Sequence, residues 1–337
     1  MKRAALAWLA GTVVVLYTAW SFGYMPFHGS NWVRNDSNHY LTIAQGGYVA
    51  IPCGEGDDPP HCGNTGWFPG YPLLIRAAHL TGLSWPWAGL VVAWAAGLGA
   101  LMLICRFTRS WPVLLYASLA PGVVFTRSVF PLSLALVATL GFLWHMRRER
   151  WLLAGLCGAA AVCAYPTAAA LALTGLWGIR RSRGLPSLLT LAGLVPAFAL
   201  ERIETGHWDA YFLCQQKPLQ YGPHHDLREP FARLIGSFKL DHGVMQAWQT
   251  IAVTLLFAIA VWVWSRDRDW LLLAWAVPAW LAAYSESWVA VYRTEAALMP
   301  LALVLPRLPK PVAWAFATSA VALAIPMTGF FVRSTLM

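Results

Sequence analysis

Apolar segments long enough to cross a membrane recur along almost the whole chain, and they constrain its fold more than any other feature. About 20 apolar residues span the roughly 30 Å of hydrocarbon in a bilayer as an α-helix. Hydrophobic residues make up 58% of the sequence and charged residues 12%, whereas soluble domains usually carry about 25% charged residues. The sequence therefore predicts an all-α polytopic membrane protein with about eleven spans, at 4–24, 86–105, 111–125, 129–145, 151–165, 167–179, 185–200, 248–264, 270–286, 294–306 and 311–332.

The formal net charge of +9 reflects membrane topology. Basic residues fall in short clusters between apolar segments, and assigning every cluster to the cytoplasm gives an alternating topology that obeys the positive-inside rule. This distribution argues against nucleic acid as a partner, and it places the N-terminus in the cytoplasm. The clusters are Lys2-Arg3, Arg106 to Arg109, Arg147 to Arg150, Arg180 to Arg183, Arg266 to Asp269, and Arg307 to Lys310.

Residues 1–337 form a single membrane domain in this interpretation, and its first segment is an uncleaved helix because no small-residue cleavage site precedes Tyr24. Two long segments, 25–85 and 201–247, lie on the external side, while the cytoplasmic links are short. The turns near Arg127 and Pro166 are predicted to be tight external hairpins. Function is therefore expected on the external side.

The first external segment contains two stretches with apolar residues at helical spacing, one from Tyr40 to Tyr48 and one from Pro72 to Leu80. Both are predicted to be short amphipathic helices in the membrane interface. The alternative is that they only cover the helix bundle.

Cys53 and Cys62 flank a Gly- and Pro-rich stretch in the same segment, where an oxidising compartment favours a disulfide. A metal site that uses His61 is the alternative, but no second Cys/His cluster has zinc spacing. The sequence His224-His225-Asp226 in the second external segment also admits a metal site, although adjacent histidines on a polar loop are more often solvated. The remaining four cysteines are typical of small core residues. No metal ligand set is predicted.

Asp36 is the most specific candidate for chemistry. It lies at the mouth of the first helix and is followed by an amphipathic segment. A carboxylate held there can accept a hydroxyl proton as a general base. Asp is also a favoured N-cap, so the alternative is that it begins the next helix. The two roles do not exclude each other.

Further ionisable residues lie near the predicted external helix ends, where charges next to apolar spans are candidates for function. Arginine carries a fixed charge and a fork that matches phosphate oxygens, so a carboxylate and an arginine suit a lipid-phosphate sugar donor. Snorkelling and Arg–Glu pairing between helices are the alternatives. These residues are Arg76, Arg127, Arg293, Glu286 and Glu295.

The stretch Asp36 to Tyr48, DSNHYLTIAQGGY, resembles the signature WDSxHYLxIAxxGY of PIG-V-like mannosyltransferases. The stretch Trp67 to Arg76, WFPGYPLLIR, resembles that family's FFPLYPLLIR segment, in the expected order and spacing. Weaker similarities occur at 125–130, 165–167, 211–216 and 292–300. Arg127 stands where the family usually has an acid, and Tyr165 stands where it usually has an arginine, which puts donor or acceptor specificity in question.

The resemblance implies a GT-C fold in which a long external first loop carries the catalytic acid. It implies that Asp36 is the general base of an inverting transfer from a polyprenyl- or dolichyl-phosphate sugar, most simply mannose. The acceptor hydroxyl belongs to a glycan, glycolipid or protein. The leaving phosphate is already anionic, so no metal cofactor is expected.

The resemblance and the residue chemistry together nominate a wider site. Arg293 and Arg76 are expected to hold the donor phosphate. His39 lies one helical turn beyond Asp36 and is expected to orient the acid or the sugar. Gln215 and Gln216 are expected to bind sugar hydroxyls. Trp67 and Tyr71 stack on the sugar or anchor the loop in the interface.

Two other functions remain open at this point. A transporter or flippase for lipid-linked sugars would share the external charges, but it favours internal repeats or charges near the bilayer midplane. A non-catalytic protein that binds lipid-linked sugars is compatible with the departures at Arg127 and Tyr165. The Ala-, Trp- and Arg-rich composition favours a bacterial plasma membrane, with the active site outside the cytoplasm.

Overall fold

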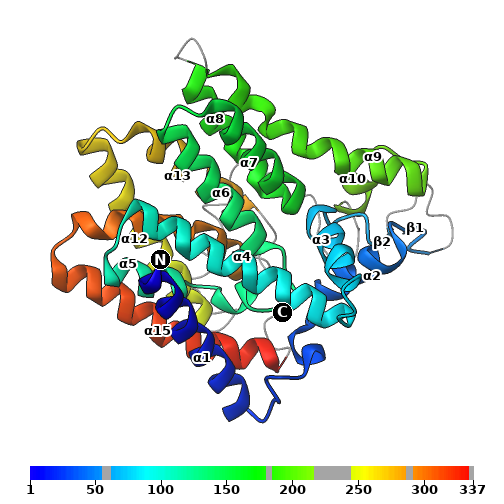
Figure 1. Ribbon diagram of the computed structural model, residues 1–337, viewed down its shortest axis with the longest axis horizontal. Helices are drawn as coiled ribbons and strands as arrows, with labels where there is room; N and C mark the ends of the chain where they lie inside the picture. The colour runs from blue at the N-terminus through cyan, green and yellow to red at the C-terminus, as the bar shows by residue number, and fades with distance from the viewer. Residues whose placement is uncertain (55–61, 180–183, 216–243, 286–290, 334–337) are drawn as a thin grey trace.

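The protein folds into a bundle of helices with one short β-hairpin (Figure 1). The computed structural model describes residues 1–54, 62–179, 184–215, 244–285 and 291–333. The first half of the chain contains α1 (Lys2–Ser21), η1 (Gly29–Trp32), α2 (Ser37–Gly46), β1 (Ala50–Ile51), β2 (Cys62–Gly63), α3 (Gly70–His79), α4 (Trp85–Phe107), α5 (Trp111–Ser118), η2 (Val123–Thr126), α6 (Leu132–Arg147) and α7 (Trp151–Ala164). The second half contains η3 (Pro166–Ala170), α8 (Leu171–Ile179), η4 (Leu185–Gly193), α9 (Leu194–Thr205), α10 (Ala210–Gln215), α12 (Val244–Arg266), α13 (Trp270–Ser285), α14 (Val291–Thr294), η5 (Glu295–Arg307) and α15 (Lys310–Val332).

In the described part of the chain, five helical segments are long and apolar enough to cross a membrane, which is compatible with an integral membrane protein. They are Lys2–Ser21, Trp85–Phe107, Leu185–Thr205, Ala247–Arg266 and Lys310–Val332. Shorter apolar helices accompany them at Leu132–Arg147, Trp151–Ala164, Pro166–Ile179 and Trp270–Ser285. The all-α membrane fold is therefore confirmed, while the number of eleven spans stays a prediction.

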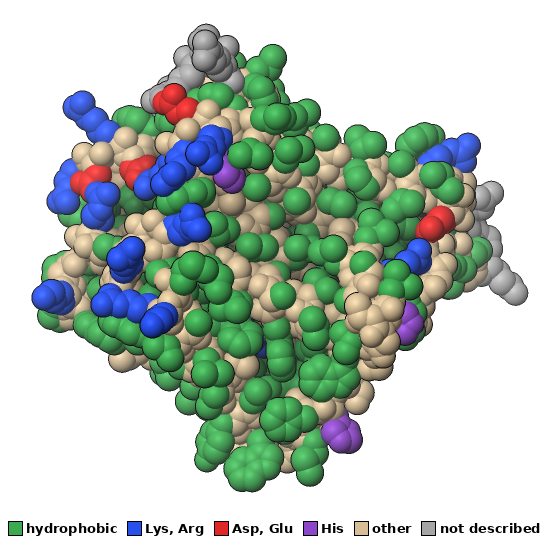
Figure 2. Space-filling view, viewed as in Figure 1, with side chains coloured by type: hydrophobic (Ala, Val, Ile, Leu, Met, Phe, Trp, Pro, Cys, Tyr) green, Lys and Arg blue, Asp and Glu red, His purple; other side chains and the backbone are tan. Residues whose placement is uncertain are grey.

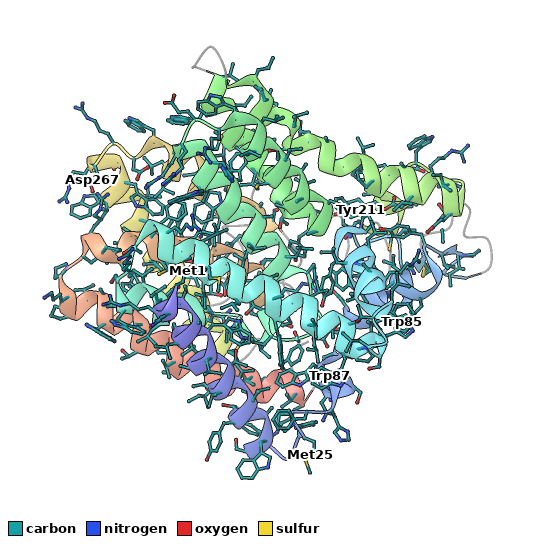
Figure 3. All side chains as sticks on the ribbon, in the orientation of Figure 1. Met1, Met25, Trp85, Trp87, Tyr211 and Asp267 are labelled. Atoms are coloured by element: carbon teal, nitrogen blue, oxygen red, sulfur yellow. A yellow bond between two sulfur atoms is a disulfide. The ribbon has the colours of Figure 1, made fainter. Side chains whose placement is uncertain are left out.

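The basic clusters gather at one end of the bundle, which we call the basic end. Arg3 donates from Nη1 to the carbonyl oxygen of Arg109 at 3.0 Å. Ion pairs join Arg147 to Asp269 and Arg307 to Asp267. Figure 2 shows the Lys and Arg side chains concentrated on the left of the view, where Figure 3 labels Asp267. Clusters far apart in sequence thus share one end, as a single-sided topology requires. The cluster at 180–183 lies outside the described residues.

The two long segments meet at the opposite end, which we call the loop end. Thr65 donates from Oγ1 to the carbonyl oxygen of Ala210 at 3.0 Å, and the backbone N–H of Tyr48 donates to Glu204 Oε2 at 2.5 Å. Figure 3 places Trp85 and Tyr211 on this side of the molecule, away from Asp267. The first long segment therefore packs against the start of the second.

The two short helices expected in the first long segment are α2 and α3. Their packing is specific, because the rings of Tyr40 in α2 and Tyr71 in α3 meet edge to face with centroids 5.7 Å apart. Both tyrosines are buried, whereas Leu73 and Leu74 on α3 are exposed. An apolar exposed face of this kind suits the membrane interface, which is where the amphipathic pattern predicts these helices.

The segment from α5 to α6 crosses the bundle as a broken helix. Ser118 at the end of α5 donates to the carbonyl oxygen of Ala7 at 2.5 Å, while the N–H of Val129 donates to the carbonyl oxygen of Trp32 at 3.1 Å. Gly122 allows the turn between them, because its φ of 76° is left-handed and a Cβ there would lie 2.7 Å from the carbonyl oxygen of Tyr292.

The turn near Arg127 differs from the predicted external hairpin. Val123 to Ser128 are all buried, and Arg127 contacts Thr12, which lies midway along α1. The prediction failed because a short polar interruption between two apolar segments has the same sequence appearance whether it lies outside the bundle or within it.

Candidate functional site

Asp36 lies at the loop end, at the junction of η1 and α2. It occupies the N-cap position of α2, but its side chain makes no capping hydrogen bond. Its backbone carbonyl oxygen instead begins the helix by accepting from the N–H of His39 at 3.0 Å. Asn35, immediately before it, has a left-handed φ of 52°. The carboxylate is therefore turned away from the helix backbone and is available to another partner.

That partner is Arg293, which lies 257 positions away in the sequence. Arg293 Nη1 donates to Asp36 Oδ2 in a charge-assisted hydrogen bond. The side chains are 21% exposed for Arg293 and 18% exposed for Asp36. The pair is therefore partly desolvated, with part of each side chain still exposed. Charge-assisted hydrogen bonds are among the stronger ones in proteins.

Arg293 is presented by α14, a short helix fixed by a buried polar network. Thr294 Oγ1 donates to the carbonyl oxygen of Ala283 at 2.8 Å. Gln249 Nε2 donates to the carbonyl oxygen of Tyr292 at 2.9 Å and to Glu295 Oε2 at 2.7 Å. Because these contacts come from α12 and α13, the position of Arg293 depends on the packing of three helices.

Glu295, two residues after Arg293, is an acid whose hydrogen-bond partners are other side chains of the protein. Its Oε1 accepts from the hydroxyl of Tyr284 at 2.7 Å, while Gln249 satisfies its Oε2. Both carboxylate oxygens are thus occupied by protein, and the side chain is buried. Glu295 supports α14 and presents no free acceptor to a ligand.

Both sequence neighbours of Asp36 carry a buried polar atom without a hydrogen-bond partner among the described residues, namely Asn35 Oδ1 and Ser37 Oγ. Ser128 Oγ is a third such atom. Ser128 precedes Val129, whose N–H donates to the carbonyl oxygen of Trp32. Native proteins leave few such atoms unpaired, and none of these three has a hydrogen-bond partner among the described residues. Sequence analysis missed these residues, because a lone Asn or Ser beside an apolar segment carries no distinguishing signal.

His39, Trp67 and Gln215 form a second cluster one helical turn along α2 from Asp36. The His39 and Trp67 rings stack with centroids 3.6 Å apart and an interplanar angle of 11°. Gln215 Nε2 donates to the carbonyl oxygen of Gly66 at 3.4 Å, which brings α10 beside this stack. All three side chains are half-buried. The structure thus brings these nominated residues together.

Tyr48 holds the backbone of this second cluster at Trp67. Its hydroxyl donates to the carbonyl oxygen of Trp67 at 2.8 Å. Burial raises the pKa of Tyr48 well above its usual value, and the nearby Glu201 carboxylate raises it further. The phenol therefore stays protonated at physiological pH and serves as a fixed hydrogen-bond donor.

Arg76 and Tyr71 are placed away from Asp36 and have other partners. Arg76 donates from Nε to the carbonyl oxygen of Ala44 at 2.8 Å and from Nη2 to that of Ile43 at 3.3 Å. It therefore satisfies the C-terminal carbonyls of α2, about 12 Å from the end that carries Asp36, at 1.5 Å per residue. Tyr71 is fully buried and donates to the carbonyl oxygen of Gly89 at 2.8 Å, so it joins α3 to α4 inside the protein.

A disulfide joins Cys53 to Cys62. It lies next to the antiparallel pair β1–β2, in which Ile51 faces Cys62 and Ala50 faces Gly63. The bond therefore closes the base of the stretch between the two strands and leaves α2 and α3 free to pack on the bundle.

Several nominated positions lie outside the described residues, namely Gln216, Glu286, His61 and the sequence His224-His225-Asp226. Among the residues that the structure describes, no group of three or more His, Cys, Asp or Glu side chains is arranged to hold a metal ion. The chemistry available at the site is that of a carboxylate, a guanidinium and the neighbouring polar and aromatic groups.

Comparison with known proteins adds no assignment: no family model, curated protein or solved structure matches the chain.

Proposed function

We propose that the protein is an integral membrane glycosyltransferase that moves a sugar, most simply mannose, from a polyprenyl-phosphate donor to an acceptor hydroxyl. The observation that carries the proposal is the Asp36–Arg293 pair, partly exposed at the loop end. It unites the acid of the PIG-V-like signature with a late arginine that the same resemblance includes. The proposal includes a GT-C-type bundle of about eleven spans, with the N-terminus and the basic end in the cytoplasm.

The pair supplies the two groups that this transfer needs. The acceptor hydroxyl gives its proton to the Asp36 carboxylate as its oxygen bonds to the anomeric carbon. The bond from that carbon to the phosphate oxygen breaks on the opposite face, and the lipid phosphate leaves with the electron pair. The sugar is therefore transferred with inversion. Charge that develops on the departing phosphate is stabilised by the Arg293 guanidinium, whose donors suit phosphate oxygens.

The second cluster is suited to hold the sugar. The stacked His39 and Trp67 rings offer an aromatic surface, and Gln215 offers amide groups for sugar hydroxyls. Arg76 is not part of this proposed site, since its guanidinium is occupied by the end of α2. Asn35 and Ser37, the sequence neighbours of Asp36, carry buried polar atoms that have no partner among the described residues.

The test is sugar transfer from radiolabelled polyprenyl-phosphate-mannose in membranes that contain the wild-type protein or the Asp36→Asn variant. Loss of a general base lowers rates by about 10²–10⁴-fold, and we expect a loss in that range. Asp209→Asn is the matched control, because Asp209 is an exposed acid beside α10 and its loss should leave transfer unchanged. A chelator arm asks whether transfer needs a divalent metal, and we expect none.

Two outcomes would overturn the proposal. Full transfer by the Asp36→Asn variant would show that the acid is not the base. Donor binding without transfer by the wild-type protein, over a panel of acceptors and donor sugars, would favour a carrier or a scaffold for lipid-linked sugars.

A further inference from the structure

The helix α9 ends in the way that membrane-spanning helices usually end. It closes the segment Leu185–Thr205, one of those long and apolar enough to cross a membrane, and Val195 near the start of α9 is 64% exposed. Charged side chains are exposed on α9 only in its last turn, at Arg202 and Glu204. Long basic side chains near a helix end extend toward the membrane surface. This order of apolar and then charged surface is typical of a segment that leaves the hydrocarbon at its end.

Beyond α9 the chain folds back along the same helix as α10. The backbone N–H of Tyr211 donates to Glu201 Oε2 at 3.0 Å, and the rings of Phe212 and Phe198 stack with centroids 5.8 Å apart. Phe198 lies about 10 Å along the axis from the end of α9, at 1.5 Å per residue. Figure 1 shows α10 next to the C-terminal half of α9. The chain therefore returns, in α10, to the level of the apolar part of α9.

The outward side of α10 is aromatic. Trp208, which precedes the helix, is 62% exposed, and Phe212 within it is 52% exposed. These two residues are four positions apart, which is the spacing of residues on one side of a helix. The inward side is packed, because Ala210, Leu213 and Cys214 are buried. The helix thus presents a narrow apolar face made of two large aromatic side chains.

A lipid bilayer is the partner that fits this face. Because Phe212 stacks on Phe198, the exposed aromatic surface of α10 is continuous with α9, which belongs to an apolar segment of membrane-spanning length. Ile203 in the last turn of α9 is also apolar and is 77% exposed. Tryptophan is enriched where a membrane meets water, and helices with one apolar face lie in that interface. The continuity with α9 therefore argues for lipid as the partner.

We infer that α10 is an interfacial helix whose Trp208 and Phe212 side chains are embedded in the bilayer leaflet at the loop end. Helices of this kind bury their apolar face about 5–10 Å into the boundary between head groups and acyl chains. The inference extends the interfacial placement from α2 and α3, in the first long segment, to the second long segment. It is independent of the proposed sugar transfer, because it concerns contact with lipid and is tested without a transfer reaction.

Hydrogen bonds from α10 connect this placement to the second cluster. Thr65 Oγ1 donates to the carbonyl oxygen of Ala210 at 3.0 Å, and Gln215 Nε2 donates to that of Gly66 at 3.4 Å. Residues 65 and 66 directly precede Trp67, whose ring is stacked in that cluster. An α10 embedded in the leaflet therefore holds the second cluster next to the leaflet.

The test places a nitroxide at one position of the full-length protein in phosphatidylcholine nanodiscs. The amino acid p-acetylphenylalanine replaces Val195, Trp208, Asp209 or Phe212 and is labelled through its ketone, so that every cysteine stays unchanged. Power saturation measures collisions with oxygen, which concentrates in lipid, and with a neutral nickel chelate, which stays in water. We expect about tenfold fewer nickel collisions at Phe212 than at Asp209, because a polar solute is strongly disfavoured in an apolar phase. Oxygen collisions at Phe212 should match those at Val195.

Asp209 is the matched reference for water, because it is exposed and directly precedes α10, and Val195 is the reference for lipid. Each labelled protein has to keep the wild-type unfolding midpoint, and Trp208 and Phe212 report separately if one label prevents folding. Equal nickel collision rates at Asp209 and Phe212 would refute the inference, because the face would then lie in water. Low collision rates with both probes at Trp208 and Phe212 would also refute it, because protein would then cover the face.

Discussion

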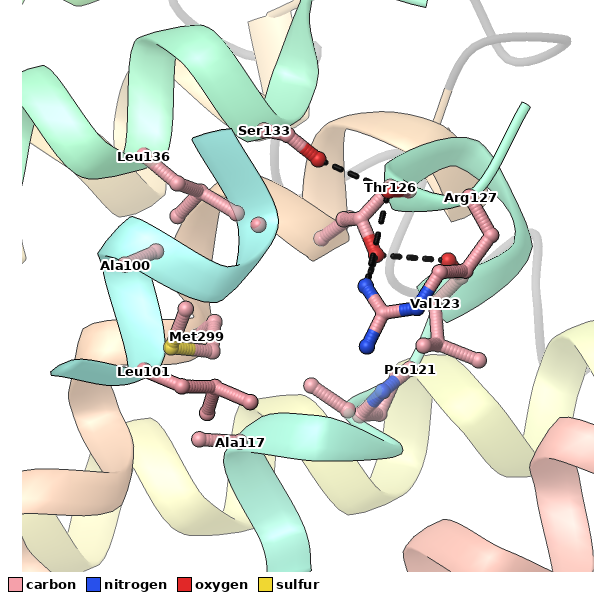
Figure 4. Close-up of a pocket in the computed structure, with 13 residues that line it drawn as sticks. Ala100, Leu101, Ala117, Pro121, Val123, Thr126, Arg127, Ser133, Leu136 and Met299 are labelled. Carbon is pink, nitrogen blue, oxygen red and sulfur yellow. Dashed lines mark hydrogen bonds between the residues drawn. The ribbon is translucent and has the colours of Figure 1, made fainter. Parts of the chain in front are cut away.

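Arg293 and Arg127 are both arginines set among apolar helices, and their surroundings differ in one decisive respect. Arg293 is paired with Asp36 and remains 21% exposed. Arg127 is 3% exposed; among the described residues its partners are neutral and its Nη2 has no hydrogen-bond partner (Figure 4). A buried charge without an acid is strongly unfavourable. The contrast is that the first arginine has an acid as partner, whereas the second has none among the described residues.

The comparison assigns different consequences to removing each charge. Loss of Arg293 leaves a partly buried carboxylate unpaired and removes a donor from the proposed reaction centre. Loss of Arg127 removes an uncompensated charge from an apolar wall. Stability should therefore fall when Arg293 is replaced and rise when Arg127 is replaced.

Arg293→Gln is expected to have the largest effect. Removing one preorganised donor from a transition state typically lowers turnover by about 10²–10³-fold, and sugar transfer from polyprenyl-phosphate-mannose should fall by that factor. Arg34→Gln, at a neighbouring arginine that has no acid partner among the described residues, should transfer at nearly the wild-type rate. Equal losses of transfer in the two variants would show that pairing with Asp36 gives Arg293 no special role in the reaction.

The disulfide provides a test of how the acid is presented. A Cys53→Ser/Cys62→Ser double variant should lose about 2–3 kcal/mol of stability, the amount expected for closing a loop of about ten residues. Transfer at low temperature should stay within about threefold, because Asp36 is held by η1, α2 and Arg293 rather than by the hairpin. Denaturation with and without reductant measures the first effect. Loss of transfer in a folded variant would show that the hairpin belongs to the site.

Arg127→Met sharpens the comparison by reversing its sign. In neutral detergent, this variant should be more stable than the wild type by about 1–2 kcal/mol, because a buried charge without an acid partner among the described residues has been removed. Arg293→Met should be less stable under the same conditions. Thermal unfolding followed by tryptophan fluorescence compares them directly. A less stable Arg127→Met protein would indicate that neutral partners satisfy this arginine fully.

Arg76→Ala is expected to have the smallest effect. Arg76 hydrogen-bonds the last carbonyls of α2 and is exposed. Loss of such an end contact typically lowers stability by about 0.5–1.5 kcal/mol. Transfer should fall by less than about threefold, with the donor concentration for half-maximal rate unchanged. A tenfold rise in that concentration would instead place Arg76 in the donor site.

The sequence predicted the helical membrane fold and nominated Asp36 as the candidate acid, because both inferences rest on local signals. Long apolar segments predict membrane helices, and an acid just before a predicted helix can be identified from its position in the sequence. The gathering of the basic clusters at one end also followed from charge alone. These features need no knowledge of which helices touch.

What the sequence did not provide was the partnership of distant residues. Arg293 and Arg76 were nominated for the same task, yet one lies beside Asp36 and the other at the far end of α2. Arg127 was expected in an external turn, yet the turn folds back among α1 and α4. Each outcome depends on long-range packing, so no local pattern distinguishes three arginines that all follow or precede apolar residues.

The central claim is that Asp36 and Arg293 act as one unit in sugar transfer, and a double-mutant cycle on the transfer rate tests it most directly. Residues that act together are not additive when they are removed. The account predicts that Asp36→Asn/Arg293→Gln transfers sugar at about the rate of the slower single variant. Losses that multiply, so that the double variant is slower by the product of the two single effects, would contradict it.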